Sequence, residues 1–376
     1  MAGHDQGRPV VVVACDKFKG SLTAREVDDA VAAGILAAHP ETEVRIVPIA
    51  DGGDGTVAAL AGAGFDLVPV EVAGPTLDPV AAHYAVRGDL AVVELADTCG
   101  LLRLPGGRLA PLTATSRGLG EAVLAALDGG ARTIVIGLGG SASNDGGSGM
   151  LRALGVRLLD ASGAELAEGG AALQSLARID LDGLDPRLRD IEIVVACDVD
   201  NPLLGPRGAV ATFSAQKGAG PREQAILEES LTTYASLISD ALGRSAPEDT
   251  PGAGAAGGVG FAALAVLGGR VERGVELLLG LVGFAEALAG ADLVVTGEGS
   301  FDHQTLSGKA PMGVLQAARE AGIPATVVCG RTTLSPTEAA EAGAAGVRAL
   351  LDLEPDPELC MTNAAELLRQ LGGELV

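Results

Sequence analysis

One polar stretch of the sequence follows directly on an apolar run. The segment 295–311, VTGEGSFDHQTLSGKAP, brings together carboxylates, a histidine and a lysine. Asp302 has the chemistry of a base or a metal ligand. Lys309 precedes a predicted helix near Met312, where a phosphate would meet both an ammonium and a helix N-terminus. A lone His303 is more typical of a surface or packing position. The segment therefore predicts a site for an anionic ligand.

A pair of lysines follows the first apolar run of a chain that contains few lysines. Lys17 and Lys19 lie in DKFKGS, residues 16–21. Either ammonium group could neutralise a carboxylate or a phosphate of a substrate. The alternative is a solvated turn without a ligand.

The motif DGGDGT, residues 51–56, holds carboxylates three residues apart with glycines between them. Asp51 and Asp54 could hold Mg²⁺ through water or orient a hydroxyl group for attack. The alternative is a structural role in which Asp54 caps the following helix. A single cap does not require the full motif, so the pattern favours function.

The glycine-rich segment 137–149, GLGGSASNDGGSG, is the strongest candidate for binding an anion. Its glycines let backbone amides approach a phosphate, and the helix predicted from Met150 would add its positive end. The segment lacks the GK[ST] of a Walker A loop. It matches the GxGxxA dinucleotide fingerprint, with Asp160 at a suitable distance, but residues 144–147 would interrupt the first turns of the helix. A phosphate loop of another kind, a dinucleotide site and a structural turn remain the alternatives.

Three further motifs offer the same choice between a ligand and a structural role. Asp198 and Asp200 lie in CDVDNPL, and residues 216–218 read QKG. The segment 252–260, GAGAAGGVG, predicts either a close contact between helices or another anion-binding nest.

Most of these clusters follow a predicted strand. Residues 10–14 form a continuous apolar run typical of a strand buried on both faces, and further strands are predicted at 44–50, 133–137, 191–196 and 293–296. In open parallel sheets, ligands bind outside the carboxyl ends of the strands, so the clusters can converge. Thr23 and Glu26 form a capping box for a helix that is predicted to reach about Ala38.

The alternation of strands and helices predicts an α/β protein of two domains. Residues 1–69 and 286–376 are expected to form one discontinuous, parallel-sheet domain of the Rossmann or flavodoxin-like type. Residues 70–285, which begin with short alternating segments, are expected to form an inserted α/β domain with a mixed sheet. The active site is predicted in the cleft between the two domains.

Composition excludes several classes of partner. The chain has 376 residues and a net charge of −23, which disfavours binding to nucleic acid or to anionic membranes. No apolar run is long enough to span a bilayer. The five cysteines lack CxxC spacing and are expected to be buried thiols in a reducing compartment. These features predict a soluble, cytoplasmic protein.

In their order along the chain, the motifs resemble those of the glycerate kinase family, in particular the type found in the bacterial glyoxylate pathway. The resemblance rests on eight segments: ACDKFKGSLTA at 14, PIADGGDGT at 48, TSRGLGE at 115, IGLGGSASNDGGSGML at 136, ACDVDNPLLGPRGA at 196, QKGA at 216, PGAGAAGGVGF at 251 and TGEGSFDHQTLSGKAPMGV at 296. One departure is that Ser214 and Ala215 stand where the family usually has Gly-Pro, which affects the local turn and any role of Lys217.

The resemblance implies phosphorylation of D-glycerate by ATP with Mg²⁺. It is greatest to the subgroup that phosphorylates the 2-hydroxyl group and gives 2-phosphoglycerate. Spacing alone does not distinguish this product from 3-phosphoglycerate. Whether the protein is a monomer or a homodimer is also left open.

Placement at strand ends and charge type suggest a role for each candidate. Phosphates of ATP would be held by Gly139, Gly140, Ser141, Ser143, Asn144, Gly146 and Gly147. Glycerate would be bound by Lys17, Lys19, Asp51 and Ser21. Mg²⁺ would be anchored by Asp198 or Asp145. Asp302 or Asp54 would orient the attacking hydroxyl, and Lys309 would steady the transferring group.

Two rival functions are compatible with parts of the pattern. The GxGxxA match alone would suit a dehydrogenase that uses NAD and a hydroxy acid. The same glycines would also suit a non-catalytic module that binds a small acid or a nucleotide.

Overall fold

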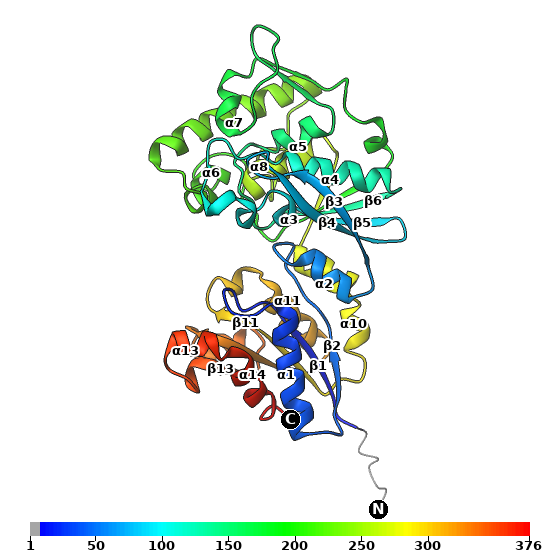
Figure 1. Ribbon diagram of the computed structural model, residues 1–376, viewed down its shortest axis with the longest axis vertical. Helices are drawn as coiled ribbons and strands as arrows, with labels where there is room; N and C mark the ends of the chain where they lie inside the picture. The colour runs from blue at the N-terminus through cyan, green and yellow to red at the C-terminus, as the bar shows by residue number, and fades with distance from the viewer. Residues whose placement is uncertain (1–7) are drawn as a thin grey trace, which may run out of the picture. The chain divides into compact units, whose positions relative to one another are not determined.

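The computed structural model describes residues 8–376, which form two compact units. The first consists of the chain up to Asp51 together with Val275–Val376, and the second of Gly52–Gly274. Each unit contains its own sheet and its own helices (Figure 1).

The first unit is built on a five-stranded sheet in which every neighbouring pair is parallel. In spatial order the strands are β13 (Gly346–Ala349), β12 (Ala325–Thr332), β11 (Leu293–Phe301), β1 (Val10–Cys15) and β2 (Glu43–Ile46). Counting only the strands of this unit, the order is 2-1-3-4-5, which is the flavodoxin-like order. The strand order reverses between β1 and β11, and in this fold type a ligand binds at such a switch point.

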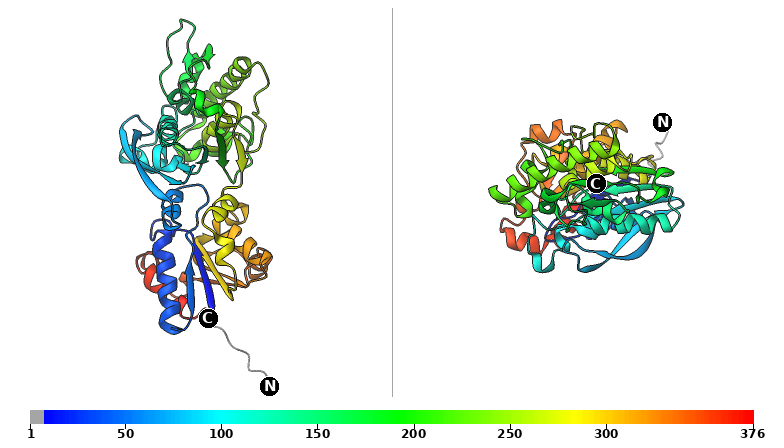
Figure 2. Two further views of the ribbon diagram at one scale, coloured as in Figure 1. Left: turned by 90° about the vertical axis from the view of Figure 1, so that its right-hand side faces the viewer. Right: turned by 90° about the horizontal axis from the view of Figure 1, so that it is seen from above.

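Helices cover both faces of this sheet because its strands are apolar on both faces. Along β1, Val11 and Val13 pack into a core with α1 (Ala24–Ala38) and α14 (Ala364–Gly372). Val12 packs into a second core with α11 (Ala310–Glu320) and with residues of α9 (Gly274–Leu281), α10 (Phe284–Ala287) and α12 (Pro336–Glu341). In Figure 2, α1 runs alongside the strands. The predicted capping box at its start is confirmed, since the Thr23 and Glu26 side chains each bond the other's backbone N–H.

The second unit contains a mixed six-stranded sheet. Its spatial order is β10 (Arg270–Glu272), β9 (Glu192–Ala196), β6 (Thr133–Gly137), β5 (Leu90–Glu94), β4 (Pro79–Arg87) and β3 (Asp66–Ala73). β3, β4 and β5 pair antiparallel, whereas the pairs from β5 to β10 are parallel. A separate pair joins β7 (Arg157–Leu159) to β8 (Arg178–Asp180).

One large core stabilises the second unit. Ile134 and Ile136 of β6 pack with Leu119 of α4 (Arg117–Asp128) and with Phe261 of α8 (Ala255–Ala265). The remaining α-helices of this unit are α2 (Thr56–Gly62), α3 (Leu95–Cys99), α5 (Ser148–Ala153), α6 (Ala209–Phe213) and α7 (Pro221–Leu242). Aromatic packing in this core is limited to an edge-to-face contact between Phe261 and Tyr234, as expected for a chain with so few aromatic residues.

The predicted fold class is confirmed, but the domain boundaries differ from the predicted ones. Residues 52–69 belong to the second unit because β3 pairs with β4 from Asp66 onward and because Glu94 binds backbone amides at the start of α2. Residues 275–285 belong to the first unit, where Val275 and Phe284 are buried in its core. The boundaries therefore lie near 51 and 275 rather than near 69 and 285.

All five cysteines are unpaired and buried, as predicted. Across residues 8–376, none of the helices combines the length and the apolar character needed to cross a bilayer.

Candidate active site

Acidic side chains gather at the switch point of the first sheet. The amide of Asp16, directly after β1, donates to the carbonyl of Gly297 in β11 at 2.8 Å. Burial raises the pKa of Asp16 to about 6; the charge of Lys17 opposes this shift, and the charges of Asp51 and Glu298 add to it. The three acids therefore lie close enough to affect one another. Sequence reasoning missed Asp16, although it begins the DKFKGS motif.

The lysines of the DKFKGS motif lie in different environments. The Lys17 ammonium lies 3.8 Å from a carboxylate oxygen of Asp16, and its side chain is 29% exposed. Lys19 is exposed. The hydroxyl of Ser21 donates to the carbonyl of Met361 at 2.6 Å, so it joins this loop to α13 (Pro357–Thr362). Lys17 is thus the candidate that lies directly beside the acidic cluster.

Glu298 fixes the position of Lys309. Its carboxylate, only 7% exposed, accepts a hydrogen bond from the Thr305 hydroxyl and one of 3.2 Å from the Lys309 ammonium. Burial raises the pKa of Glu298, while these two partners act in the opposite direction. Lys309 is also the N-cap residue of α11, as its position in the sequence predicted. Glu298 was not among the predicted site residues.

Asp302 is held by its own loop. Its carboxylate accepts hydrogen bonds from the backbone N–H of Gln304 at 2.9 Å and from the Ser300 hydroxyl at 3.0 Å. Partial burial acts to raise the pKa of Asp302, but these bonds and the charge of Lys309 together hold it below its usual value. The group is therefore ionised at neutral pH and suits binding of a cation or a hydroxyl. His303 is exposed and faces Glu338, which agrees with its prediction as a surface residue.

In the second unit, three glycine-bearing or acidic motifs meet at the carboxyl ends of β6 and β9. The amide of Gly139 donates to the carbonyl of Gly52 at 3.1 Å, and that of Leu138 donates to the carbonyl of Ala196 at 3.4 Å. A Cβ atom on Gly139 would lie 2.3 Å from the Cα of Gly53. Close backbone packing therefore requires glycine at 139, and it brings the DGGDGT, GLGGS and ACDVD motifs together.

Glu94, at the end of β5, caps the helix that follows the DGGDGT motif. Its carboxylate accepts from the amides of Gly55 at 3.0 Å and Val57 at 2.9 Å. Burial raises its pKa to about 7, although both amides favour the charged form. Asp54 is exposed and the N-cap residue of α2 is Gly55, so the interpretation of Asp54 as the helix cap is wrong. No local sequence signal identifies Glu94, because it lies in a different element.

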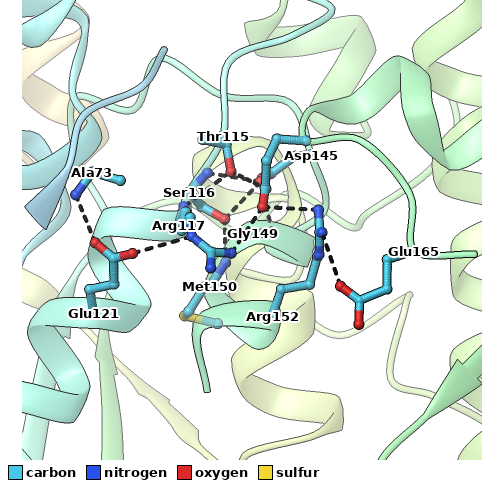
Figure 3. A network of polar contacts seen from close by, with 11 residues as sticks. Ala73, Thr115, Ser116, Arg117, Glu121, Asp145, Gly149, Met150, Arg152 and Glu165 are labelled. Carbon is cyan, nitrogen blue, oxygen red and sulfur yellow. Dashed lines mark hydrogen bonds and ion pairs between the residues drawn. The ribbon is translucent and has the colours of Figure 1, made fainter. Parts of the chain in front are cut away.

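Asp145 is the centre of a buried hydrogen-bond network (Figure 3). One carboxylate oxygen accepts from the amide and hydroxyl of Ser116, both at 2.8 Å, and from the Gly149 amide at 3.1 Å. The other accepts from the Gly147 amide at 3.1 Å. These contacts tie the glycine-rich segment to the start of α4 and give Asp145 a structural task. Its assignment as a metal ligand stays a prediction, which these contacts do not favour.

Most of the glycine-rich segment is enclosed. Residues 141–149 are buried, whereas Gly139 is half-buried and Gly140 is exposed. Within residues 8–376, the amides of Gly140 and Ser141 have no hydrogen-bond acceptor, unlike those of Gly139 and Ala142. Next to exposed Gly140, the segment therefore has two neighbouring amides that can donate hydrogen bonds to an anion.

The buried end of the segment packs against the GAGAAGGVG motif. The amide of Gly146 donates to the carbonyl of Gly257 at 2.9 Å. A Cβ atom on Gly257 would lie 2.2 Å from the carbonyl oxygen of Ser143, and the φ of Gly257 is +69°. Of the two interpretations of this motif, the geometry favours close packing. It leaves Ser143, Asn144, Gly146 and Gly147 without open access from solvent.

The last two candidates from the sequence are Asp198 and the QKG motif. Asp198 is half-buried directly after β9, whereas Asp200 is exposed. Lys217 is buried, and its ammonium donates to the hydroxyl of Ser141 and to the carbonyl of Ser143, both at 2.6 Å. The glycine-rich segment is thus held by a lysine from a distant motif.

Comparisons with known proteins give a consistent result. A family model described as the glycerate kinase family matches residues 11–376. Glycerate kinase of Bacillus subtilis (strain 168) is 46% identical over 323 residues, which cover 85% of this chain and 84% of the relative. Glycerate 2-kinase of Escherichia coli (strain K12) is 43% identical over 326 residues, which cover 86% and 85% of the two chains.

A solved structure agrees with these sequence matches. A crystal structure assigned as glycerate kinase 2 of Salmonella typhimurium LT2 superposes with a TM-score of 0.83 at 41% identity, covering 98% of this chain and 97% of that one. Fold and matches together define a two-domain α/β kinase. More particularly, the chain belongs to the glycerate kinase family. The resemblance and the enzyme class predicted from sequence are thereby confirmed, and the family implies ATP as the phosphoryl donor.

The dinucleotide interpretation of the GxGxxA match is not supported. In a dinucleotide-binding fold the helix begins at the second glycine of the fingerprint. Here α5 begins only at Ser148, well beyond Gly139. The fingerprint match is therefore a coincidence of spacing.

Proposed function

We propose that this protein transfers the γ-phosphoryl group of ATP to the 2-hydroxyl group of D-glycerate and releases 2-phosphoglycerate. The family match along residues 11–376 supports the reaction, and the relative named glycerate 2-kinase supports the position. The observation that carries the proposal is the cluster of acids and lysines at the switch point between β1 and β11, where this fold type binds its ligands.

Glycerate is small and anionic, so it needs a cation and hydroxyl-binding groups. Lys17 and Lys19 supply cations beside the end of β1, and Ser21 lies in the same loop. Asp51, whose charge acts on Asp16, is assigned to the binding of a substrate hydroxyl. Lys17 is the strongest candidate for the substrate carboxylate because it is half-buried beside the acidic cluster.

The chemical step requires an aligned hydroxyl and neutralisation of charge on the transferred group. Asp302 is ionised and half-buried, which suits orientation of the attacking hydroxyl. Asp54 is the alternative for this role. Lys309, fixed by Glu298, would stabilise the transferring phosphoryl group. The placement of the active site between the two domains stays a prediction.

The nucleotide phosphates are assigned to the segment 139–147. The part near exposed Gly140, with the amides of Gly140 and Ser141, is suited to direct contact with a phosphate of ATP. Ser143, Asn144, Gly146 and Gly147 are buried, and we now assign them to the shape of the segment rather than to contact with ATP.

Mg²⁺ is expected with ATP, and the residues present fit it in part. The ion keeps several waters and needs only one or two carboxylates besides phosphate oxygens. Asp198 meets this requirement at the end of β9, whereas both oxygens of Asp145 already accept backbone amides. In the described part of the chain, three or more acidic, His or Cys side chains are nowhere grouped to hold a metal. When bound, Mg²⁺ would neutralise charge on the phosphates.

A coupled assay tests the proposal directly. ADP release should depend on D-glycerate, and phosphorus NMR of the product should identify 2-phosphoglycerate. A 3-phosphoglycerate signal would support the alternative position. Binding of ATP without turnover would instead support a non-catalytic module and would contradict the proposal.

The cysteines and the net charge bear on the cellular location and the partners of the enzyme. We propose a cytoplasmic location because the five buried thiols are suited to a reducing compartment. Partners other than the small-molecule substrates are not needed for the reaction, and the net charge of −23 argues against nucleic acid. A monomer and a homodimer remain alternatives.

A further inference from the structure

Lys217 is a buried cation, for which the sequence left a ligand-binding role and a structural role as alternatives. It ends a short helical turn, Ala215–Lys217, and only 2% of the residue is exposed. Among residues 8–376 it forms no ion pair, and its two acceptors are the Ser141 hydroxyl and the Ser143 carbonyl. Removal of an ammonium from water without a paired carboxylate is costly. A group retained at such a cost is a candidate for a functional role.

The ionisation of Lys217 reflects this environment. Burial lowers its pKa to about 7, and the charge of Asp145 opposes the shift. Asp145 does not bond to Lys217, because its oxygens are occupied by Ser116, Gly147 and Gly149. Among residues 8–376, the hydrogen bonds of the lysine ammonium are therefore those to the glycine-rich segment.

These contacts hold the segment next to its exposed end. The two acceptors lie on either side of Ala142, whose own amide donates to the Cys99 carbonyl at 3.1 Å. The Gly140 carbonyl accepts from the Leu101 amide at 2.9 Å. Residues 140–143 are thus fixed by backbone bonds to 99–101 and by the Lys217 ammonium. Asp145 acts further along, on residues 145–149.

We propose that Lys217 is a positioning residue for the nucleotide, which holds Ser141–Ser143 so that the neighbouring amides of Gly140 and Ser141 can bind a phosphate of ATP. This inference rests on the nucleotide role proposed above for segment 139–147. Lys217 does not itself touch ATP, because it is buried beneath the segment. Its effect is on the geometry and on the local positive potential of the phosphate site.

Steady-state kinetics of Lys217→Met test this proposal. The substitution keeps the length of the side chain and removes the ammonium. KM for ATP should rise at least about tenfold, while KM for D-glycerate should change less than about twofold. Lys217→Gln retains a neutral donor and should give a smaller rise in KM for ATP.

A matched control separates positioning from loss of stability. Ile238→Ala creates a cavity in the core of the same unit, on α7. It should lower the melting temperature without changing KM for ATP. If Lys217→Met lowers the melting temperature but leaves KM for ATP unchanged, the residue is merely structural and the proposal is wrong. If Lys217→Met does not fold, Lys217→Gln decides by the same criterion.

Direct calorimetric titration with ATP, without glycerate, separates this proposal from the proposed function. If the wild type binds ATP but has no glycerate-dependent turnover, the function is wrong while the inference can still be tested by ATP affinity. In that case Lys217→Met should weaken ATP binding at least about tenfold. Equal affinities of the wild type and the variant would overturn the inference. Absence of ATP binding by the wild type would overturn both.

Discussion

Neighbouring acids at the end of the first sheet differ in ionisation although they influence one another. Burial raises the pKa values of Asp16, to about 6, and of Glu298, whereas local hydrogen bonds keep that of Asp302 low. Environments that separate the pKa values of close carboxylates commonly separate their chemical tasks. Asp302 is therefore negatively charged at neutral pH, whereas Asp16 changes its charge near pH 6.

Substitution of Asp302 or Lys309 tests the proposed chemistry. Asp302→Asn removes the charge that is proposed to orient the hydroxyl, and Lys309→Ala removes the cation that is proposed to stabilise the transferred group. Each should lower turnover at least about 10²-fold in the glycerate-dependent ADP assay. Asp54→Asn should do the same only if Asp54 is the orienting acid. A folded variant with a near-normal rate would remove that residue from the mechanism.

The raised pKa of Asp16 predicts a specific dependence of stability on pH. The folded protein holds this proton more tightly than the unfolded chain, whose value is about 3.8. The contribution of Asp16 to the unfolding free energy is therefore complete below pH 3.8. It is lost as the pH rises through about 6. Asp16→Asn removes this titration. The unfolding free energy of the wild type relative to Asp16→Asn should fall by about 3 kcal/mol between pH 3.8 and about 6, measured by urea denaturation. A constant difference would contradict the assignment.

At the scale of elements, the loops that bear the motifs are fixed by groups from other elements. Glu94 of β5 caps α2, Asp145 ties the glycine-rich segment to α4, and Glu298 orients Lys309 at the start of α11. Rigid support of this kind holds functional groups within the small tolerances that catalysis requires. Loss of such a support should affect the loop more than the rest of the unit.

Glu94→Ala tests this dependence. Removal of the carboxylate leaves the Gly55 and Val57 amides without their acceptor and should lower the unfolding free energy by about 1–2 kcal/mol. Hydrogen exchange should report faster exchange at these two amides. The exposed Glu71 of β3 is a matched control, and Glu71→Ala should leave both exchange rates unchanged. Unchanged protection in Glu94→Ala would show that the cap has no energetic role.

At the scale of the whole molecule, each unit has a complete core. The second unit, Gly52–Gly274, is one continuous stretch of chain around its own sheet and core. The first is assembled from both ends of the chain, so β1 pairs with β11 across a large sequence separation. A continuous unit with its own core can fold alone.

Expression of Gly52–Gly274 by itself tests this independence. The fragment should unfold cooperatively on heating, and its NMR amide signals should be well dispersed, because its core lies within the fragment. Phe261→Ala in the same fragment should lower the melting temperature, since it opens a cavity of a large buried side chain. A fragment without a cooperative transition would mean that the second unit needs the first.

The sequence by itself determined the fold class, the strands that precede the candidate motifs, and the family. Continuous apolar runs identified β1, β6 and β9, and the capping box located α1, because these signals are local. Positions of acids and lysines after strands also pointed to Lys17, Asp302 and Lys309 as members of one sheet end.

Only the tertiary structure decided which side chains support these groups. Glu94, Glu298 and Lys217 act on loops that belong to other motifs, and no local pattern reveals such partners. Burial was also decided by packing: the closeness of Gly257 to Ser143 encloses most of a segment that reads as an open phosphate loop. Burial and long-range hydrogen bonds depend on how distant elements meet, whereas residue type and spacing record only what is near along the chain.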